Sequence, residues 1–598
     1  MACEYCSTSY SKEQIIEGSK KHLCETCSYL EDMINNFVIN THPIYVIDLT
    51  KKFLSICPIF NEGKIISANS ARIDLSGYDE EKIIKKITNK LELNDTKYLD
   101  KKSIAMITNH LMGHLFDNVR EIITDNPKGY LLSFLKLLEY NIHITMAAVS
   151  WLNRGEKAFK IEEITDNFSR TVVQSLDLQK KYNSSFNSIY KEWENVLALD
   201  KQAFQYGIEI INYYSERVPE SNKKLNDDKF GELIATVRAI FFILNVRDIA
   251  SEGLLSENQL IIDKEGLLRV NQKIDHDYFS DFYVDAMINR RKVSISNVIS
   301  KQFDQVCQKY IGVDLDGVQK IGHDLLRTYK NSDEFLIGSI SYFKLLFMEL
   351  LNIPVEASER LLALFMNDQD TLEFAVSTTE REYRPLRKCL IPIKNDIIAC
   401  PVSLLSYAAT ALYLDIIENS LPESSFKREL FKITSQLHEE FEKEVANSLK
   451  TTFKDALIKY NVRKENEIPF HYKKGYVTLS GQIDVLILVQ GKLFVIECKD
   501  NPYKYTAKAI SNELNKFRKV SKGSYQFKLR NKINDIKENW DSVISYLGVA
   551  DPHSVEKHEP IGLFVVDSFS ASALEEELVY PVVLFSGLRN YIYERLIT

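Results

Sequence analysis

Two strongly apolar segments near the C-terminus, residues 483–489 and 492–499, are separated only by Gln490 and Gly491. β-Branched residues and leucine fill most of the first segment, the run Leu-Phe-Val-Ile forms the middle of the second, and a two-residue link ending in glycine favours a tight hairpin turn. This pair of strands constrains the fold more than any other feature of the chain. A shift of one residue in their pairing would turn every side chain to the opposite face of the sheet.

The hairpin brings two carboxylates together. With a two-residue turn, Asp484 lies directly opposite Glu497 and Gln482 opposite Lys499; a longer loop with a bulge at Gly491 would place the two acids diagonally instead. Directly opposed residues have Cβ atoms ~4.5–5.5 Å apart, so the carboxylates would repel each other without a cation. Carboxylate oxygens suit Mg²⁺ or Mn²⁺. The sequence therefore predicts a divalent metal site on this hairpin.

The spacing of these residues resembles a known motif. Asp484, followed thirteen residues later by Glu497, Cys498 and Lys499, is similar to the PD-(D/E)xK motif of the restriction-endonuclease-like nucleases. The form G-x-I-D-V followed by V-I-E-C-K is especially similar to the Mrr-like and Holliday-junction-resolvase-like branches. Ile483 stands where the motif usually has proline. The resemblance covers about residues 430–598, under a third of the chain.

The resemblance implies a Mg²⁺-dependent endonuclease on an α/β fold with a mixed sheet. Asp484, Glu497 and the main-chain carbonyl of Cys498 would hold one Mg²⁺ or Mn²⁺. Lys499 would position or help deprotonate the attacking water and stabilise the developing negative charge. In-line attack would cleave a phosphodiester bond and leave a 5′-phosphate. DNA is the expected substrate.

Two further residues match positions that the family often uses. A helix ahead of the motif commonly carries F-E-x-x-V, and Phe441, Glu442 and Val445 fit this pattern, so Glu442 is expected to support the metal or a second ion. After the motif the family commonly has a helix with glutamine or tyrosine and basic residues. Tyr525 and Gln526 fit that pattern, with Gln526 as the expected site residue.

The charge distribution also favours a polyanionic substrate. The whole chain carries a formal charge of −8, which excludes a uniformly basic coat. Residues 501–540, however, contain ten Lys or Arg and three Asp or Glu, a local net charge of +7. A solvated helix face would have a similar composition, but its position beside the carboxylates favours phosphate binding. The expected nucleic-acid-binding residues are Lys516, Arg518, Lys519, Lys522, Lys528 and Arg530.

Four cysteines near the N-terminus have the spacing of a zinc site. Cys3 and Cys6 form one CxxC pair, and Cys24 and Cys27 form a second after seventeen residues. A segment this short buries too little apolar surface to fold alone, and disulfides would be reduced inside a cell. We expect a structural Zn²⁺, because four thiolates leave no open position for catalysis. A contact with nucleic acid or a partner through residues 20–22 is the alternative.

The rest of the chain predicts a multidomain arrangement. After the zinc knuckle (residues 1–30), residues 31–385 are expected to be mainly helical with an unknown recognition role, as one or two subdomains, with short strands before residue 75. A hairpin–helix connector is expected at 386–425 and the nuclease domain at 426–598. In that last domain, a long amphipathic helix is predicted from Phe426 to about Tyr460.

The sequence indicates a soluble, cytoplasmic protein, since it has neither a signal peptide nor an apolar run long enough for a membrane span. It also lacks a P-loop, so any energy-dependent translocation would need another protein, and an ATPase or a sensor is a candidate partner. A homo-oligomer remains open. The expected function is a DNA nuclease acting as the effector of a prokaryotic antiviral defence system. The alternatives are a repair or mobile-element nuclease, and a helical binding scaffold with an inactive nuclease fold.

Overall fold

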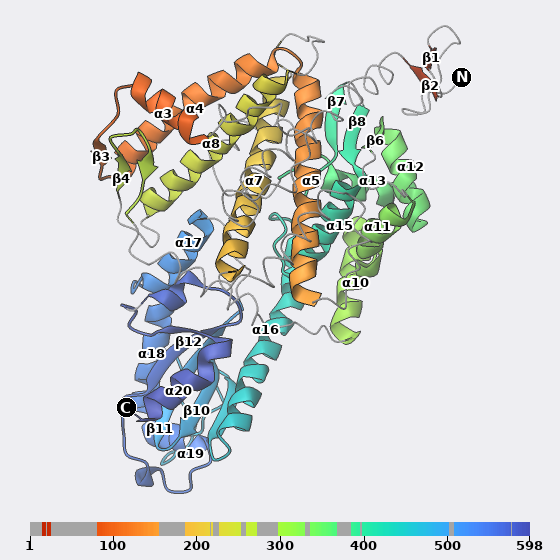
Figure 1. Ribbon diagram of the computed structural model, residues 1–598. Coiled ribbons are helices and arrows are strands. Elements are labelled where there is room, and N and C mark those ends of the chain that lie inside the picture. Colours follow the sequence, from red (N-terminus) through yellow and green to blue (C-terminus); the bar gives the residue numbers. More distant parts are fainter. Residues whose placement is uncertain are drawn as a thin grey trace. The chain divides into compact units, whose positions relative to one another are not determined.

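The computed structural model (Figure 1) describes most of the helical region and nearly all of the C-terminal third. The short strands expected before residue 75, and Cys3, Cys6 and Cys27, lie outside the described residues. The described ranges are 15–18, 21–24, 80–154, 186–215, 217–218, 226–252, 259–271, 297–328, 335–367, 384–394, 397–500, 507–575 and 577–597.

Near the N-terminus, the backbone forms a short hairpin between the two cysteine pairs. Strand β1 (Ile15–Gly18) runs antiparallel to β2 (Lys21–Cys24), and Ile15 lies opposite Cys24. Cys24 is therefore the last residue of β2 and precedes Cys27, the other cysteine of its CxxC pair, by three residues in the sequence. The zinc site itself stays a prediction.

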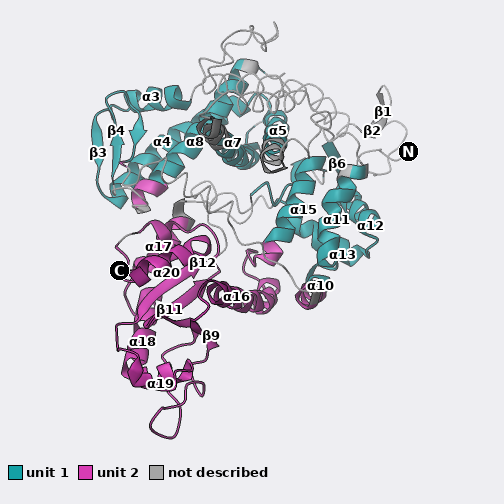
Figure 2. Ribbon diagram, turned by 60° about the horizontal axis from the view of Figure 1, so that its bottom comes forward, with its two compact units in different colours: residues 1–247, 259–270, 307–414 teal, residues 248–258, 271–306, 415–598 magenta. Residues whose placement is uncertain are grey.

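The chain divides into two compact units, coloured separately in Figure 2. The first unit contains residues 1–247, 259–270 and 307–414, and the second contains residues 248–258, 271–306 and 415–598. The prediction of a mainly helical region followed by a C-terminal domain with a mixed sheet is confirmed at this level.

Long helices dominate the chain between residues 80 and 417, as the apolar periodicity predicts. Residues 124–126 and 352–354 each separate two consecutive helices. The helices are α3 (Glu80–Lys90), α4 (Lys101–Ile123), α5 (Pro127–Arg154), α7 (Phe186–Ser215), α8 (Asp227–Glu252), α10 (Asn297–Ile311), α11 (Leu315–Thr328), α12 (Ile340–Leu351), α13 (Val355–Phe365) and α15 (Val402–Ile417).

Helices α5 and α7 pack closely because glycine stands at their point of contact. A Cβ atom at Gly207 of α7 would lie 2.4 Å from Cε1 of Phe134 on α5. The Phe134 ring packs edge-on against Phe204 and Phe230, with ring centroids 6.0 and 5.9 Å away. Aromatic side chains from α5, α7 and α8 thus form the centre of the helical core.

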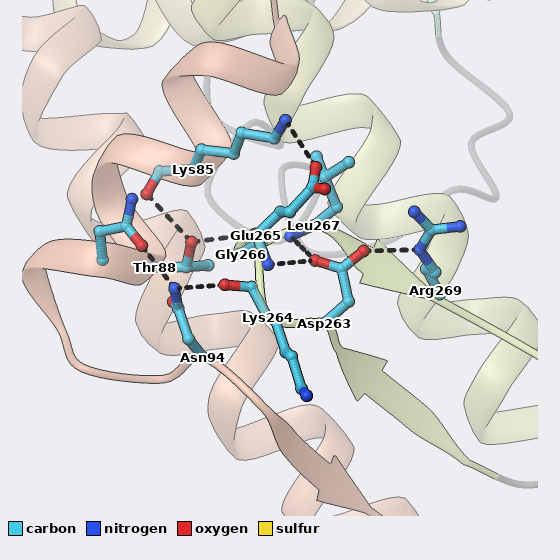
Figure 3. A network of polar contacts seen from close by, with 10 residues as sticks. Lys85, Thr88, Asn94, Asp263, Lys264, Glu265, Gly266, Leu267 and Arg269 are labelled. Atoms are coloured by element: carbon cyan, nitrogen blue, oxygen red, sulfur yellow. Dashed lines mark hydrogen bonds and ion pairs between the residues drawn. The ribbon is translucent and has the colours of Figure 1, made fainter.

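A small three-stranded sheet joins segments of the first unit that lie far apart in the sequence. It contains β3 (Thr96–Tyr98), β4 (Leu260–Ile262) and β5 (Leu268–Arg269). In Figure 3, Asp263 organises the turn between β4 and β5: its carboxylate accepts hydrogen bonds from the Leu267 amide (3.0 Å) and the Arg269 guanidinium (2.7 Å). The Thr88 hydroxyl of α3 donates to the Gly266 carbonyl at 2.9 Å, which fixes the turn to that helix.

The hairpin predicted before the C-terminal domain is confirmed, but it belongs to a larger sheet. Strands β7 (Ile391–Lys394) and β8 (Ile397–Pro401) are antiparallel. Strand β6 (Phe335–Ser339), which the sequence did not predict, pairs with the other edge of β8.

The second unit is built around a five-stranded mixed sheet in the order β13-β12-β11-β10-β9. The hairpin strands β10 and β11 are antiparallel, as are β9 and β10, whereas β11, β12 and β13 are parallel. The strands are β9 (Leu457–Val462), β10 (Ile483–Val489), β11 (Lys492–Lys499), β12 (Ile561–Val566) and β13 (Val582–Leu584).

Helices cover both faces of this sheet, as Figure 1 shows. Helices α16 (Ser425–Thr452) and α20 (Leu588–Ile597) pack on the face that carries Val485 and Ile487. Helices α17 (Ala507–Arg518), α18 (Tyr525–Glu538) and α19 (Trp540–Tyr546) pack on the face that carries Leu486 and Leu488. Both faces of β10 and β11 are therefore buried, which accounts for their nearly continuous apolar sequences.

The predicted helix from Phe426 to about Tyr460 is too long. Helix α16 ends at Thr452, and β9 begins at Leu457. The apolar pattern of this short stretch fits either structure. Pairing with β10 decides in favour of a strand, because it satisfies the backbone groups along one edge of the sheet.

Candidate active site

The predicted hairpin register is confirmed. Gln490 and Gly491 have φ angles of 48° and 78°, as a type I′ two-residue turn requires. Val485 pairs with Ile496, so Asp484 and Glu497 stand opposite each other at the next position. Both residues are buried, with 7% of Asp484 and 6% of Glu497 exposed.

The ammonium of Lys499 marks the point at which three predicted metal ligands converge. Its Nζ lies 3.6 Å from Asp484 Oδ2 and 3.3 Å from Glu497 Oε2. It also donates a hydrogen bond to the main-chain carbonyl of Cys498 at 3.0 Å. A single cation thus contacts all three groups from the two strands.

Glu442 reaches the same site from α16. The flanking residues Phe441 and Val445 anchor the helix in the apolar cluster that includes Cys498. Glu442 is 8% exposed, and its Oε2 is buried without a hydrogen-bond partner in the structure. Burial, reinforced by the nearby charge of Asp484, raises the pKa of Glu442 to about 8.

Neighbouring charges also shift the pKa values of Asp484 and Lys499. Burial and the neighbouring Glu497 raise the pKa of Asp484 above its ordinary value, although the Cys498 amide donates to Asp484 Oδ2 at 2.8 Å. Burial would lower the pKa of Lys499, but the carboxylates of Glu497 and Asp484 more than offset it and raise that pKa. Lys499 is therefore held in its charged form.

A second lysine, which the sequence analysis did not single out, also lies in the site. Lys532 of α18 places Nζ 2.5 Å from Glu497 Oε1. It occupies the apolar stripe of α18, one turn after Leu529 and one turn before Ile536. A lysine inside the buried stripe of an amphipathic helix is the signal that could have identified it, because buried lysines are nearly always paired.

Gln526 does not join the carboxylates. Its Nε2 donates to the main-chain carbonyl of Tyr580 at 2.9 Å, and its Oε1 accepts from the Tyr580 amide at 2.9 Å. Both polar ends of the side chain are therefore used to connect α18 with the segment before β13. The neighbouring Tyr525 lies closer to the site, with its ring centroid 5.7 Å from Lys499 Nζ.

Five of the six predicted nucleic-acid-binding residues are exposed and have no acidic partner among the described side chains. They are Lys516, Lys519, Lys522, Lys528 and Arg530. Arg518 differs, because its guanidinium pairs with Glu575. The exposed cations lie on α17, on α18 and on the segment between them.

The residues present fit a divalent ion, although in the described part of the chain no three His, Cys, Asp or Glu side chains already form a metal-ligand group. Two observations support the fit. The Lys499 ammonium holds the place of a cation among three oxygen atoms. The buried Oε2 of Glu442 has no hydrogen-bond partner and can serve as a further ligand.

Comparisons with known proteins identify no family for this chain. No family model and no curated protein matches it. Among solved structures, protein VC1899 from Vibrio cholerae aligns over 69% of this chain and 88% of that chain, with 11% identity and a TM-score of 0.14. This likeness is too low to indicate a shared fold. No helix in the described ranges is long and apolar enough to cross a membrane.

Proposed function

We propose that the second unit is a metal-dependent endonuclease that hydrolyses phosphodiester bonds in DNA. The observation that carries this proposal is the convergence of Asp484, Glu497 and the Cys498 carbonyl on the Lys499 ammonium, at 3.6, 3.3 and 3.0 Å. These are the residues of the nuclease-like motif, and they come together at one point of the sheet.

Asp484, Glu497, Glu442 and the main-chain carbonyl of Cys498 would hold Mg²⁺ or Mn²⁺. When bound, such an ion lowers the pKa of a coordinated water and offsets charge on the scissile phosphate. The fold supplies orientation: the Cys498 amide fixes Asp484, and Lys532 fixes Glu497. Glu442, with a pKa of about 8, has to lose a proton to act as a charged ligand at neutral pH.

Lys499 would stabilise the negative charge that develops on the phosphate. The carboxylates of Glu497 and Asp484 raise the pKa of Lys499, which favours the charged ammonium as a hydrogen-bond donor. Of the two roles expected from the motif, electrostatic stabilisation is therefore the better supported. The nearby Tyr525 ring helps to keep the ammonium within the site.

The exposed cations of α17 and α18 would bind the phosphates that flank the cleaved bond. They are Lys516, Lys519, Lys522, Lys528 and Arg530, and such contacts bind nucleic acid without reading its sequence. The choice of DNA, and the wider role as an effector of prokaryotic defence, come from the family resemblance and the domain layout.

Cleavage assays with the purified full-length chain test this proposal. With Mg²⁺ or Mn²⁺, the protein should nick or cut circular DNA, and Asp484→Asn and Glu497→Gln should lower the rate at least about a hundredfold. Glu538→Gln, an exposed change on α18, serves as the matched control. Normal cleavage by Asp484→Asn would show that the site is wrong, and cleavage of RNA alone would overturn the choice of DNA.

A further inference from the structure

Lys532 has no counterpart among the motif residues that define the candidate site. Its side chain is 10% exposed, and its ammonium forms an ion pair with Glu497 Oε1 at 2.5 Å, whereas the other predicted cations of α18 face solvent. Burying an ammonium is costly unless a partner compensates for the lost hydration. Its ion pair with Glu497 therefore accounts for the presence of a lysine in the apolar stripe of α18.

The backbone beside the hairpin leaves room for this lysine. A Cβ atom at Gly481 would lie 2.9 Å from Lys532 Cε and 3.7 Å from its Nζ. Any larger residue at that position would displace the end of the lysine side chain. Gly481 thus permits the close approach of Lys532 to the start of β10.

The two lysines contact different oxygen atoms of the Glu497 carboxylate. Lys532 contacts Oε1, and Lys499 contacts Oε2 while it also faces Asp484. Two ammonium groups therefore neutralise two carboxylates within one buried site. A divalent cation that binds these carboxylates must compete with charges that the chain itself supplies.

We infer that Lys532 is an internal counter-ion of Glu497: it fixes the carboxylate through Oε1 and weakens the binding of divalent metal at the site. Lys532 is a positioning residue, because it acts through Glu497. The inference rests on the proposed nuclease function. Together with Lys499, it accounts for the burial of Glu497 beside Asp484 in the folded chain without an ion.

Mn²⁺ titration of the full-length chain tests the inference by calorimetry. Only the Mn²⁺ binding that Asp484→Asn abolishes is attributed to this site. Lys532→Met should bind Mn²⁺ at least about tenfold more tightly, because a positive charge close to the ion has been removed. Lys532→Arg should remain within about threefold of the wild type. Lys537→Met is the matched control: Lys537 lies on α18 like Lys532 but forms a surface ion pair with Glu559, so this change should leave Mn²⁺ affinity unchanged.

Kinetics provide a second readout. Since Lys532 orients Glu497, Lys532→Met should lower kcat about tenfold and leave the KM for DNA unchanged. A rise in KM with constant kcat would overturn the inference, because it would make Lys532 a phosphate-binding residue.

Gly481→Ala keeps the test decisive if Lys532→Met does not fold. It retains the lysine but pushes its end away from Glu497, so Mn²⁺ binding should again tighten. Unchanged or weaker Mn²⁺ binding in a folded variant would overturn the inference. If the wild type cleaves DNA but the variants do not bind Mn²⁺ more tightly, only this inference fails. If the wild type neither binds Mn²⁺ nor cleaves, the proposed function fails.

Discussion

Glu442 is a buried carboxyl whose ionisation the folded state opposes. Its pKa is about 8, above the ordinary value of 4.5, so the folded chain binds a proton that the unfolded chain has lost. The stability that this proton contributes is fully present below pH 4.5 and is lost as the pH rises to 8.

Glu442→Gln should therefore change the pH dependence of stability. The glutamine mimics the protonated acid, so the variant should match the wild type near pH 4 and be more stable above pH 8, by on the order of a few kcal/mol. Thermal denaturation across this pH range measures the difference. A stability difference that does not vary with pH would contradict the raised pKa.

Gln526 should prove structural rather than catalytic. Its amide makes two hydrogen bonds with the main chain of Tyr580, so Gln526→Ala should destabilise the unit by about 1–3 kcal/mol. Urea denaturation measures this cost. The specific activity of the folded variant should stay within about twofold of the wild type, and a loss comparable to that of Asp484→Asn would place Gln526 in the chemistry after all.

At the residue scale, the sequence predicted most of the groups that converge at the site. The alternation along β10 and β11 and the glycine in their turn were enough to place Asp484 opposite Glu497. The place of Lys532 in the apolar stripe of α18 separates it from its basic neighbours, but its partner Glu497 is evident only in the folded chain. The motif pattern predicted Gln526 as a site residue. Its hydrogen-bond partner Tyr580 lies 54 residues away in the sequence, so the pattern could not reveal this contact.

At the scale of elements, the contact between α5 and α7 depends on the absence of a side chain. Gly207→Ala would bring a methyl group to 2.4 Å from the Phe134 ring, so it should destabilise the protein by about 1–3 kcal/mol. Gly113→Ala in α4 is the matched control: apart from the adjoining backbone of α4, its new Cβ has no neighbour within 4 Å, and alanine should raise the free energy of unfolding by about 0.5–1 kcal/mol. Chemical denaturation should give opposite signs for the two variants, and equal signs would contradict the packing.

The sequence predicted elements well where their periodicity was long. The region expected to be mainly helical contains long helices such as α5 and α8, and strands β10 and β11 match the two apolar segments of the predicted hairpin. The errors lie in short strands. The stretch containing β9 was assigned to a helix and β6 was missed, because each becomes a strand only through a distant partner: β10 for β9 and β8 for β6.

At the scale of the whole chain, net charge and local charge carry different information. The formal charge of −8 would suggest a protein that avoids nucleic acid. The structure places five exposed cations, none with an acidic partner among the described side chains, on α17, on α18 and between them, in the same unit as the buried acidic site. Some of the chain's acidic side chains are therefore buried at this site, where lysine side chains compensate their charge.

The compensation of the buried carboxylates by lysines predicts that metal removal will affect the two ends of the chain differently. The C-terminal sheet has apolar clusters on both faces, and Lys499 and Lys532 compensate its buried carboxylates. Chelation should therefore leave the thermal transition of the second unit unchanged within about 1 °C.

The predicted zinc knuckle should behave in the opposite way, because so short a segment depends on its metal to fold. EDTA, or the change Cys24→Ser, should remove one zinc per chain and make residues 1–30 sensitive to protease. Metal analysis and limited proteolysis follow both events in the same sample. Unchanged zinc content in Cys24→Ser would reject the knuckle, whereas a lower transition temperature of the second unit in EDTA would show that its acidic site needs an ion to stay folded.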